Sequence, residues 1–197
     1  MRPLPLSFYE RPCLEVARDL LGKVLVRRVG RTLLAAELVE VEAYLGDEDA
    51  ASHAYRRRTP RNEIMYGRGG ACYVYLSYGM CFCMNVVTGS EGTAQAVLLR
   101  AARPIEGLQS MRKNRGLAAD AKLTQLCSGP GKLAQAFGVD LRFYGTRFDS
   151  PDWMITDEGF ETQPVEFTAG PRIGISKAKE FPYRFCVKNS PWLSRKA

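Results

Sequence analysis

Histidine is nearly absent from this sequence, and its cysteines are not spaced like metal ligands. His53 is the only histidine, and none of the six cysteines forms a C-x-x-C pair. Because zinc sites take closely spaced Cys and His ligands, we expect no metal ion. The cysteines, among them Cys81 and Cys83 on one side of a predicted strand, are expected to be buried thiols.

The sequence also has no hydrophobic run long enough to cross a membrane, and its first residues do not resemble a secretory signal. Its 197 residues, 46% hydrophobic and 25% charged, are typical of one globular domain. Because no repeat or linker divides the chain, we expect a single domain over residues 1–197. It should lie in the cytoplasm, associated with the nucleoid, if the source is bacterial, and in the nucleus if it is eukaryotic.

Positive charge is in excess, since 28 Lys and Arg stand against 21 Asp and Glu, a formal net charge of +7. The basic residues form two clusters, Arg56, Arg57, Arg58, Arg61 and Arg68, and then Arg100, Arg103, Arg112, Lys113 and Arg115. Such clusters indicate contacts to phosphates and favour a nucleic-acid partner. The alternative is a basic surface that is merely solvated.

Hydrophobic periodicity predicts the first half of the chain as a helix and a series of strands. Ser7–Glu10 resembles a capping box, and Pro12 fits the first turn of a helix that ends at Gly22. Strands are predicted at 23–28 and 32–44, joined at Gly30 as a hairpin. Two more lie within 72–87, with the turn at Tyr78-Gly79, and another lies at 96–101.

The second half alternates helices with irregular segments. We expect helices from Pro104 to Arg112 and over 119–137, the latter broken at 128–131, and closing strands at 172–176 and 183–188. Segments 46–70 and 149–167 show no sustained pattern, and the first is expected to be an extended functional surface segment. This order predicts an α+β fold with a curved antiparallel sheet and surrounding helices.

Glu42 lies near the end of a predicted strand whose inner face is otherwise apolar. A carboxylate there must reach solvent or be held by a cation, and Arg100, which ends another apolar run, is the candidate. Glu42 would then be a general base that activates a water oriented by Arg100, as in glycoside hydrolysis. A structural ion pair at the sheet rim is the alternative.

Aromatic residues are predicted near Glu42. Tyr44 shares its face, and Tyr73 and Tyr75 share a face of a later strand, so their rings would stack on an extruded base whose edge contacts His53. Cross-strand packing in a core is the alternative. Tyr78, at a hairpin apex, would fill the gap left by a flipped nucleotide, or fold back onto the sheet.

Several segments match, in order, those of a known family. They are Val39–Gly46, Asp49–His53, Thr59–Asn62, Tyr73–Met80, Phe82–Asn85, Val97–Ala101, Cys127–Pro130 with Lys132, Arg172–Gly174 and Ser190–Trp192. Together they resemble the methylpurine, or alkyladenine, DNA glycosylases from about Phe8 to Ser194. Cys81 replaces an expected aromatic residue, and Asp149–Pro164 has no match. The chain is expected to be a minimal domain, without the N-terminal tail of some members.

The resemblance implies a role for each matching residue. Glu42 would be the general base, with Arg100 and the main chain near Ile173 holding the attacking water. The implied base pocket consists of Tyr44, His53, Tyr75, Ile173 and Asn85, of which Asn85 would discriminate against the amino group of guanine. Tyr78, assisted by Met80, would be the intercalating wedge. Contacts to DNA are predicted at Arg56, Arg57, Arg58, Arg61 and Lys132.

The implied activity is hydrolysis of the bond between a damaged purine and its deoxyribose. The expected substrates are 3-methyladenine, 7-methylguanine, hypoxanthine and ethenoadenine in duplex DNA, excised by a monomer without a cofactor and without strand cleavage. Two other functions remain open. A nucleic-acid binding module would use the same charges with Glu42 merely structural, and a hydrolase of free nucleosides would need neither the basic clusters nor the wedge.

Overall fold

A hairpin near the N-terminus begins the sheet, as predicted. In the computed structural model, which describes residues 1–160 and 165–196, β1 (Val24–Val29) pairs antiparallel with β2 (Thr32–Tyr44). Gly30 turns the chain with a φ of 57°, which glycine adopts without a steric penalty. β2 is long enough to pair with β1 along its first half and with a different strand further on.

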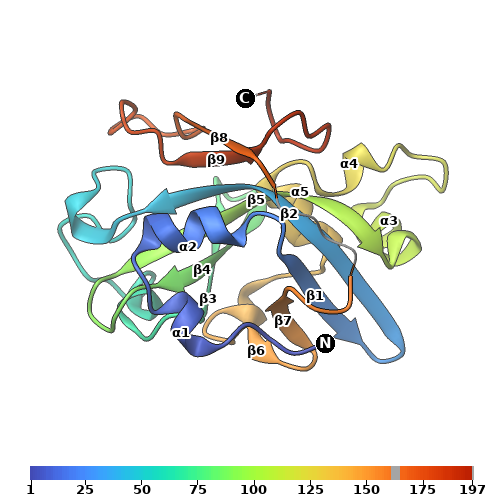
Figure 1. Ribbon diagram of the computed structural model, residues 1–197, viewed down its shortest axis with the longest axis horizontal. Helices are drawn as coiled ribbons and strands as arrows, with labels where there is room; N and C mark the ends of the chain where they lie inside the picture. The colour runs from blue at the N-terminus through green and yellow to red at the C-terminus, as the bar shows by residue number, and fades with distance from the viewer. Residues whose placement is uncertain (161–164, 197) are drawn as a thin grey trace.

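The sheet curves across the whole molecule (Figure 1). Among the described residues it has nine strands, all paired antiparallel, in the order β3-β4-β5-β2-β1-β7-β6, and β9 pairs with both β2 and β8. The further strands are β3 (Cys72–Ser77), β4 (Cys81–Thr88), β5 (Gln95–Glu106), β6 (Asp149–Ser150), β7 (Trp153–Thr156), β8 (Phe167–Gly170) and β9 (Arg184–Val187). The predicted α+β class with a curved antiparallel sheet is confirmed.

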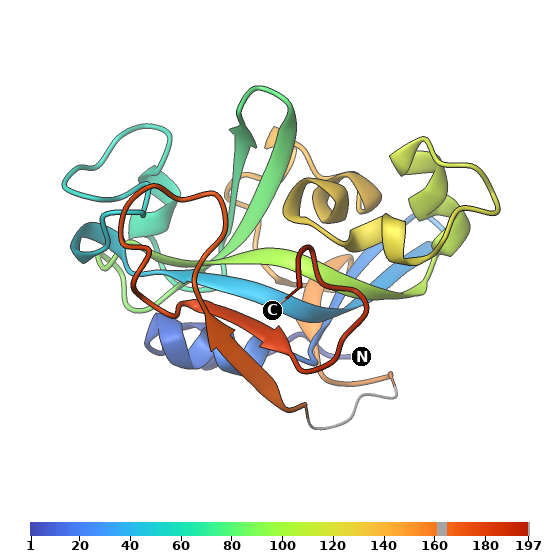
Figure 2. The same cartoon turned by 90° about the horizontal axis from the view of Figure 1, so that it is seen from above.

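Short helices lie on both sides of the sheet: α2 is on one side, and α3, α4 and α5 are on the other (Figure 2). The α-helices are α1 (Leu6–Tyr9), α2 (Cys13–Leu20), α3 (Leu108–Arg115), α4 (Thr124–Cys127) and α5 (Pro130–Ala136). Apolar residues of α2 and α5 join strand residues in the main core. Segment 46–70 contains only the short 3-10 helices η1 (Gly46–Glu48) and η2 (Glu63–Tyr66), in keeping with the prediction of an irregular segment.

Two helix starts differ from the predictions. Pro104 continues β5 opposite Ala36, at a register shift where the sheet tolerates proline, and α3 starts only at Leu108, after Gly107 in a left-handed conformation. Ser7 lies inside α1 and makes no capping bond, because the helix already begins at Leu6. Pro12 precedes α2 as its N-cap instead of lying in its first turn.

The C-terminal third also differs in part. The expected strand at 172–176 is not formed, because Arg172 turns into the interior to pair with Asp49. Instead β8 pairs with the predicted closing strand β9. The unpatterned segment 149–167 supplies β6 and β7, while its residues 161–164 and the terminal residue 197 of the predicted domain lie outside the described residues.

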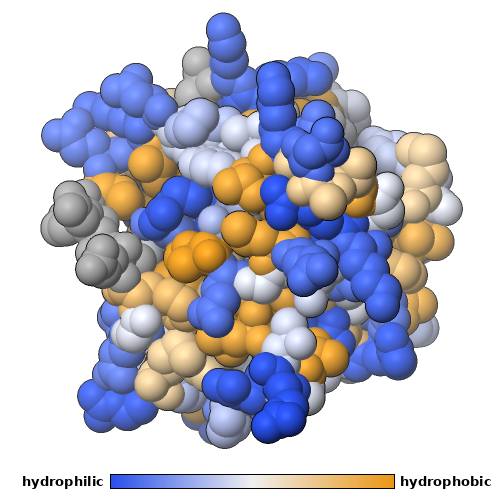
Figure 3. All heavy atoms as spheres, turned by 90° about the vertical axis from the view of Figure 1, so that its right-hand side faces the viewer, coloured by the Kyte–Doolittle hydropathy of each residue, from blue (hydrophilic) through white to orange (hydrophobic). Residues whose placement is uncertain are grey.

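The outer surface mixes polar and apolar side chains. On the face that Figure 3 displays, hydrophobic residues are interspersed with hydrophilic ones, as on most protein surfaces. No helix in the described part of the chain combines the length and the apolar character needed to span a bilayer.

Candidate active site

Two carboxylates lie on one face of β2, between two neighbouring strands. Glu40 and Glu42 are two residues apart, so their side chains point the same way, and neither has any exposed surface. β5 pairs with this part of β2 along one edge and β9 along the other. Because buried carboxylates need cations or hydrogen-bond donors, the arginines of these two strands, Arg100 and Arg184, are essential to the local structure.

An irregularity in β5 directs Arg100 at both carboxylates. Glu40 pairs with Ala101 and Val41 with Leu99, so Arg100 has no partner on β2. An extra residue of this kind forms a β-bulge, which changes the direction of a side chain. Arg100 Nη1 lies 3.2 Å from Glu42 Oε2, and its Nε lies 3.1 Å from Glu40 Oε1. The predicted pair of Glu42 and Arg100 is present, and Glu40 shares it.

Three donors hold the Glu42 carboxyl group. Besides Arg100, the Tyr44 hydroxyl donates to Oε2 at 2.9 Å and the Ile173 N–H donates to Oε1 at 2.7 Å. Burial raises the pKa of Glu42 above its ordinary value, although the charge of Arg100 and the hydrogen bonds from Ile173 and Tyr44 oppose that shift. A carboxyl group with a raised pKa beside a cation is typical of general bases.

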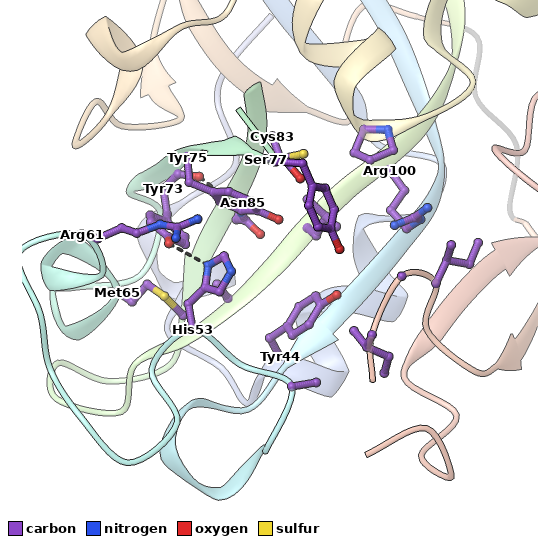
Figure 4. Close-up of a pocket in the computed structure, with 18 of the residues that line it drawn as sticks. Tyr44, His53, Arg61, Met65, Tyr73, Tyr75, Ser77, Cys83, Asn85 and Arg100 are labelled. Carbon is purple, nitrogen blue, oxygen red and sulfur yellow. Dashed lines mark hydrogen bonds between the residues drawn. The ribbon is translucent and has the colours of Figure 1, made fainter. Parts of the chain in front are cut away.

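A cavity of about 580 Å³ lies next to this carboxyl group. All three donors to Glu42 line it, as do the predicted pocket residues His53, Tyr75 and Asn85. Glu42 itself is not part of the wall and lies directly beneath its own hydrogen-bond partners. In Figure 4, Tyr44 and Arg100 border one side of the cavity, and His53, Tyr73 and Arg61 border the other.

The far side of the cavity is aromatic. The ring of Tyr75 lies 4.5 Å from that of His53, edge to face, and 5.5 Å from that of Tyr73, while His53 Nδ1 is 2.8 Å from the Tyr73 hydroxyl. Burial, assisted by the nearby charge of Arg61, lowers the pKa of His53 to about 4. The imidazole is therefore neutral near pH 7, and because Nδ1 is engaged by the Tyr73 hydroxyl, Nε2 is the ring nitrogen left for a ligand.

Asn85 lies on β4 in the same wall and is almost completely buried. Its Nδ2 donates to the main-chain oxygen of Tyr73 at 2.9 Å, opposite it in the β3–β4 register. That bond fixes the orientation of the amide group next to the cavity.

A second buried ion pair, between Arg172 and Asp49, lies behind the site and was not predicted from the sequence. Arg172, whose side chain is fully buried, pairs with Asp49, donates to the Ala43 oxygen at 2.9 Å and lies 4.6 Å from the centre of the Tyr44 ring. The pair thereby holds Tyr44 from behind and positions the next N–H, that of Ile173, on Glu42. An arginine flanked by Gly170-Pro171 and Gly174 has no periodic pattern from which burial could be predicted.

The β3–β4 hairpin exposes the residues predicted as a wedge. Tyr78 and Met80 are 83% and 81% exposed, so Tyr78 does not fold back onto the sheet. Tyr78 and Gly79 have φ values of 49° and 69°, a turn with two left-handed residues that matches the twist of a hairpin. Tyrosine in this conformation is strained, and such strain is common at functional sites.

The basic residues predicted to bind DNA have different environments. Four of them are exposed, namely Arg56, Arg57, Arg58 and Lys132, and Arg58 also pairs with Glu63. Arg61 instead lines the cavity, with its guanidinium 5.2 Å from the centre of the Tyr75 ring. Segment 46–66, the β3–β4 hairpin and α5 rise on the same side of the sheet (Figure 2). The second cluster is divided, because Arg100 and Arg103 are bound in ion pairs with glutamates of β2.

No group of three or more His, Cys, Asp or Glu residues suited to a metal ion occurs among residues 1–160 and 165–196. All six cysteines are free thiols, five of them buried.

Comparison with known proteins identifies the family. The family model "Methylpurine-DNA glycosylase (MPG)" matches residues 7–191. Proteins named "Putative 3-methyladenine DNA glycosylase" are similar over nearly their whole length. The one from Koribacter versatilis is 45% identical over 199 residues, covering 100% of this chain and 95% of its own. The one from Methanoculleus marisnigri is 45% identical over 195 residues, covering 98% and 99%.

The chain therefore belongs to the methylpurine-DNA glycosylase family. It is a DNA N-glycosylase, a hydrolase of N-glycosyl bonds whose substrate is DNA.

Proposed function

We propose that this enzyme flips a damaged purine out of duplex DNA and hydrolyses its bond to deoxyribose, with Glu42 as the general base. The observation that carries the proposal is the buried Glu42–Arg100 pair, separated from an aromatic cavity of about 580 Å³ only by the hydrogen-bond partners of Glu42. Arg100 favours the ionised carboxylate, and the raised pKa gives that carboxylate a stronger affinity for the proton of a water.

The attacking water needs access to Glu42. Both carboxylate oxygens already accept hydrogen bonds, so the water would displace at least one donor, or be shared with it, when the substrate enters. Arg100 and the main chain at Ile173 remain on either side to orient it. The water would attack the sugar carbon as the base leaves through an oxocarbenium-like transition state. Because no amine nucleophile is involved, the enzyme would be monofunctional and would leave the strand intact.

The extruded base would stack between Tyr44 and Tyr75, with its edge toward neutral His53. The fixed amide of Asn85 would discourage entry of the exocyclic amino group of guanine. We infer that 3-methyladenine and 7-methylguanine carry a positive charge while bonded to the sugar and leave as neutral bases, whereas hypoxanthine and ethenoadenine require protonation before they leave. Normal purines, being neutral and poor leaving groups, should leave slowly.

The duplex would be held on the side of the molecule that bears the hairpin. Tyr78, with Met80 beside it, would fill the gap left by the flipped nucleotide, and Arg56, Arg57, Arg58, Arg61 and Lys132 would contact phosphates. A monomer suffices for this function, because one chain supplies the complete cavity.

Base release from duplexes that carry a single 3-methyladenine, 7-methylguanine, hypoxanthine or ethenoadenine tests the proposal, with Glu42→Gln as the key variant. We expect the wild-type protein to release one or more of these bases, and the variant to bind the same duplexes without releasing any. A variant that retains the wild-type rate would exclude Glu42 as the base. Duplex binding by both proteins with no base release by either would indicate a nucleic-acid binding module. Release from free nucleosides but not from duplexes would indicate a nucleoside hydrolase.

A further inference from the structure

The glutamate two residues before Glu42 has more donors than Glu42 itself. Glu40 Oε1 accepts from Arg100 Nε at 3.1 Å, from Arg184 Nε at 2.8 Å and from the Ser194 hydroxyl at 2.7 Å. Its Oε2 accepts from the Ser194 N–H at 2.6 Å. Charge-assisted bonds of this kind are among the strongest in proteins, and here they join β2, β5, β9 and the C-terminal segment at one carboxylate.

The network also connects directly to the candidate base. Arg100 donates to Glu40 through Nε, to Glu42 through Nη1 and to the Ser194 hydroxyl through Nη2 at 3.3 Å. Arg184, in turn, donates to the main-chain oxygen of Arg195 at 2.6 Å. Two contacts that do not involve Glu42, from Nε to Glu40 and from Nη2 to Ser194, fix the plane of the Arg100 guanidinium. In that orientation Nη1 points at Glu42.

The two carboxyl groups have different protonation tendencies. Burial opposes ionisation of both, but for Glu40 the hydrogen bonds from Ser194 and Arg184 and the charge of Arg100 prevail and lower its pKa. Glu42 retains a raised pKa, to which the negative charge of Glu40 contributes. Paired carboxyl groups whose environments separate their pKa values commonly have separate tasks.

The groups that face this pair come from every element packed against it. Around Glu40 they are Arg100, Arg184, Cys186 and Ser194, with Glu42 beside it. Around Glu42 they are Tyr44, Tyr75, Arg100, Arg172 and Cys186.

We propose that Glu40 is a positioning residue for base release, which holds the Arg100 guanidinium against Glu42 and fastens the C-terminal segment at Ser194 to the floor of the site. The inference rests on the proposed role of Glu42. Glu40 does not line the cavity, so it acts through Arg100 and not by touching the substrate. Its charge also keeps Glu42 the better proton acceptor of the two.

The test compares Glu40→Gln with Glu37→Gln. Glu37 is a matched control on the same strand, since it is largely buried and pairs with Arg103 of β5 at 2.6 Å, away from the cavity. For Glu40→Gln we expect a single-turnover rate at least about tenfold lower, at unchanged affinity for lesion duplex, and an acidic limb of the pH–rate profile displaced to lower pH. The displacement follows because a negative charge beside Glu42 is removed. Glu37→Gln should match wild type.

A purely structural ion cluster would lower stability and leave the single-turnover rate of the folded variant unchanged, so an unchanged rate overturns the positioning role. An unmoved acidic limb overturns the effect of the Glu40 charge on Glu42. Titration of the ¹³C-labelled Glu42 carboxyl group in wild type and in Glu40→Gln gives the same comparison without substrate. An inactive wild-type protein would refute the proposed function alone, and this titration would still decide whether Glu40 acts on Glu42.

If Glu40→Gln does not fold, Ser194→Ala serves in its place. This change removes one donor to Glu40 and one acceptor of Arg100 while every charge remains. A single-turnover rate at least about threefold lower supports the proposal, and a rate equal to wild type overturns it.

Discussion

Glu42 has no exposed surface, and its behaviour depends on the few donors around it. Burial favours the protonated form, whereas the Arg100 charge and the hydrogen bonds from Ile173 and Tyr44 favour the ionised form. The two side-chain donors, Arg100 and Tyr44, can be removed separately, so the contribution of each to the protonation of Glu42 is measurable.

Tyr44→Phe removes the hydroxyl that donates to Glu42 Oε2 and keeps the aromatic ring. Because that bond lowers the pKa of Glu42, its loss should raise this pKa further, and the acidic limb of the pH–rate profile should move to higher pH. Base stacking and affinity for lesion duplex should stay the same. Single-turnover rates across pH for wild type and variant make the comparison. A limb that stays in place would mean that another group is titrating.

The residues of the site were predictable where they carry their own chemistry. Glu42, Arg100 and the aromatic residues were found from strand alternation and from the resemblance to the family. The partners that hold them were not, because Asp49 and Arg172 are 123 positions apart and Glu40 and Ser194 are 154 apart. Such pairs depend on the complete tertiary structure, and no local periodicity encodes them.

The β3–β4 hairpin is the element whose surface most needs a partner. Three apolar or aromatic side chains are exposed at one end of it, those of Leu76, Tyr78 and Met80. The positive φ of Tyr78 strains the backbone, and glycine or asparagine at this turn position would avoid that strain. Stacking against DNA would account for both features.

Tyr78→Ala should weaken binding to lesion duplex by about 1 to 3 kcal/mol, the scale of losing one base-stacking ring. Val29→Ala, a truncation of another exposed apolar residue beside the β1–β2 turn, is the control and should leave the affinity as it was. Fluorescence anisotropy with a labelled duplex suffices. Equal affinities for Tyr78→Ala and wild type would remove the wedge from the proposal.

Elements formed by local sequence were predicted well, and those formed by distant contacts were not. Both hairpins follow from alternation and turn residues within a few positions. Pro104 was taken as a helix start because proline favours that position, yet pairing with β2 keeps it in a strand. Segment 172–176 has the composition of a strand, but the burial of Arg172 against Asp49 excludes it.

At the scale of the whole molecule, the net charge of +7 is the main determinant of approach to DNA. The distribution of this charge decides which residues contribute to binding, since an arginine held by a buried glutamate is less free to contact a phosphate. Within residues 1–160 and 165–196, exposed Arg57 and Lys132 form no ion pair, whereas Arg103 is bound to Glu37.

Affinity for duplex DNA should fall steeply with salt, because each phosphate contact releases counterions. Arg57→Ala and Lys132→Ala should each reduce the slope of log K against log salt by about 1. Arg31→Ala, at the β1–β2 turn, should leave the slope unchanged. Binding isotherms between about 50 and 200 mM salt cover the informative range. A flat response in wild type would contradict the proposed basic DNA-binding side.

The site takes its carboxylates from β2 but its Ile173 N–H and its Ser194 anchor from near the other end of the chain. A ribosome releases Glu42 long before either of them. Until they emerge, the Glu42 carboxylate lacks the Ile173 donor and Glu40 lacks Ser194, so the proposed site is incomplete. The order of synthesis thus completes the proposed site only after Ser194 has been made.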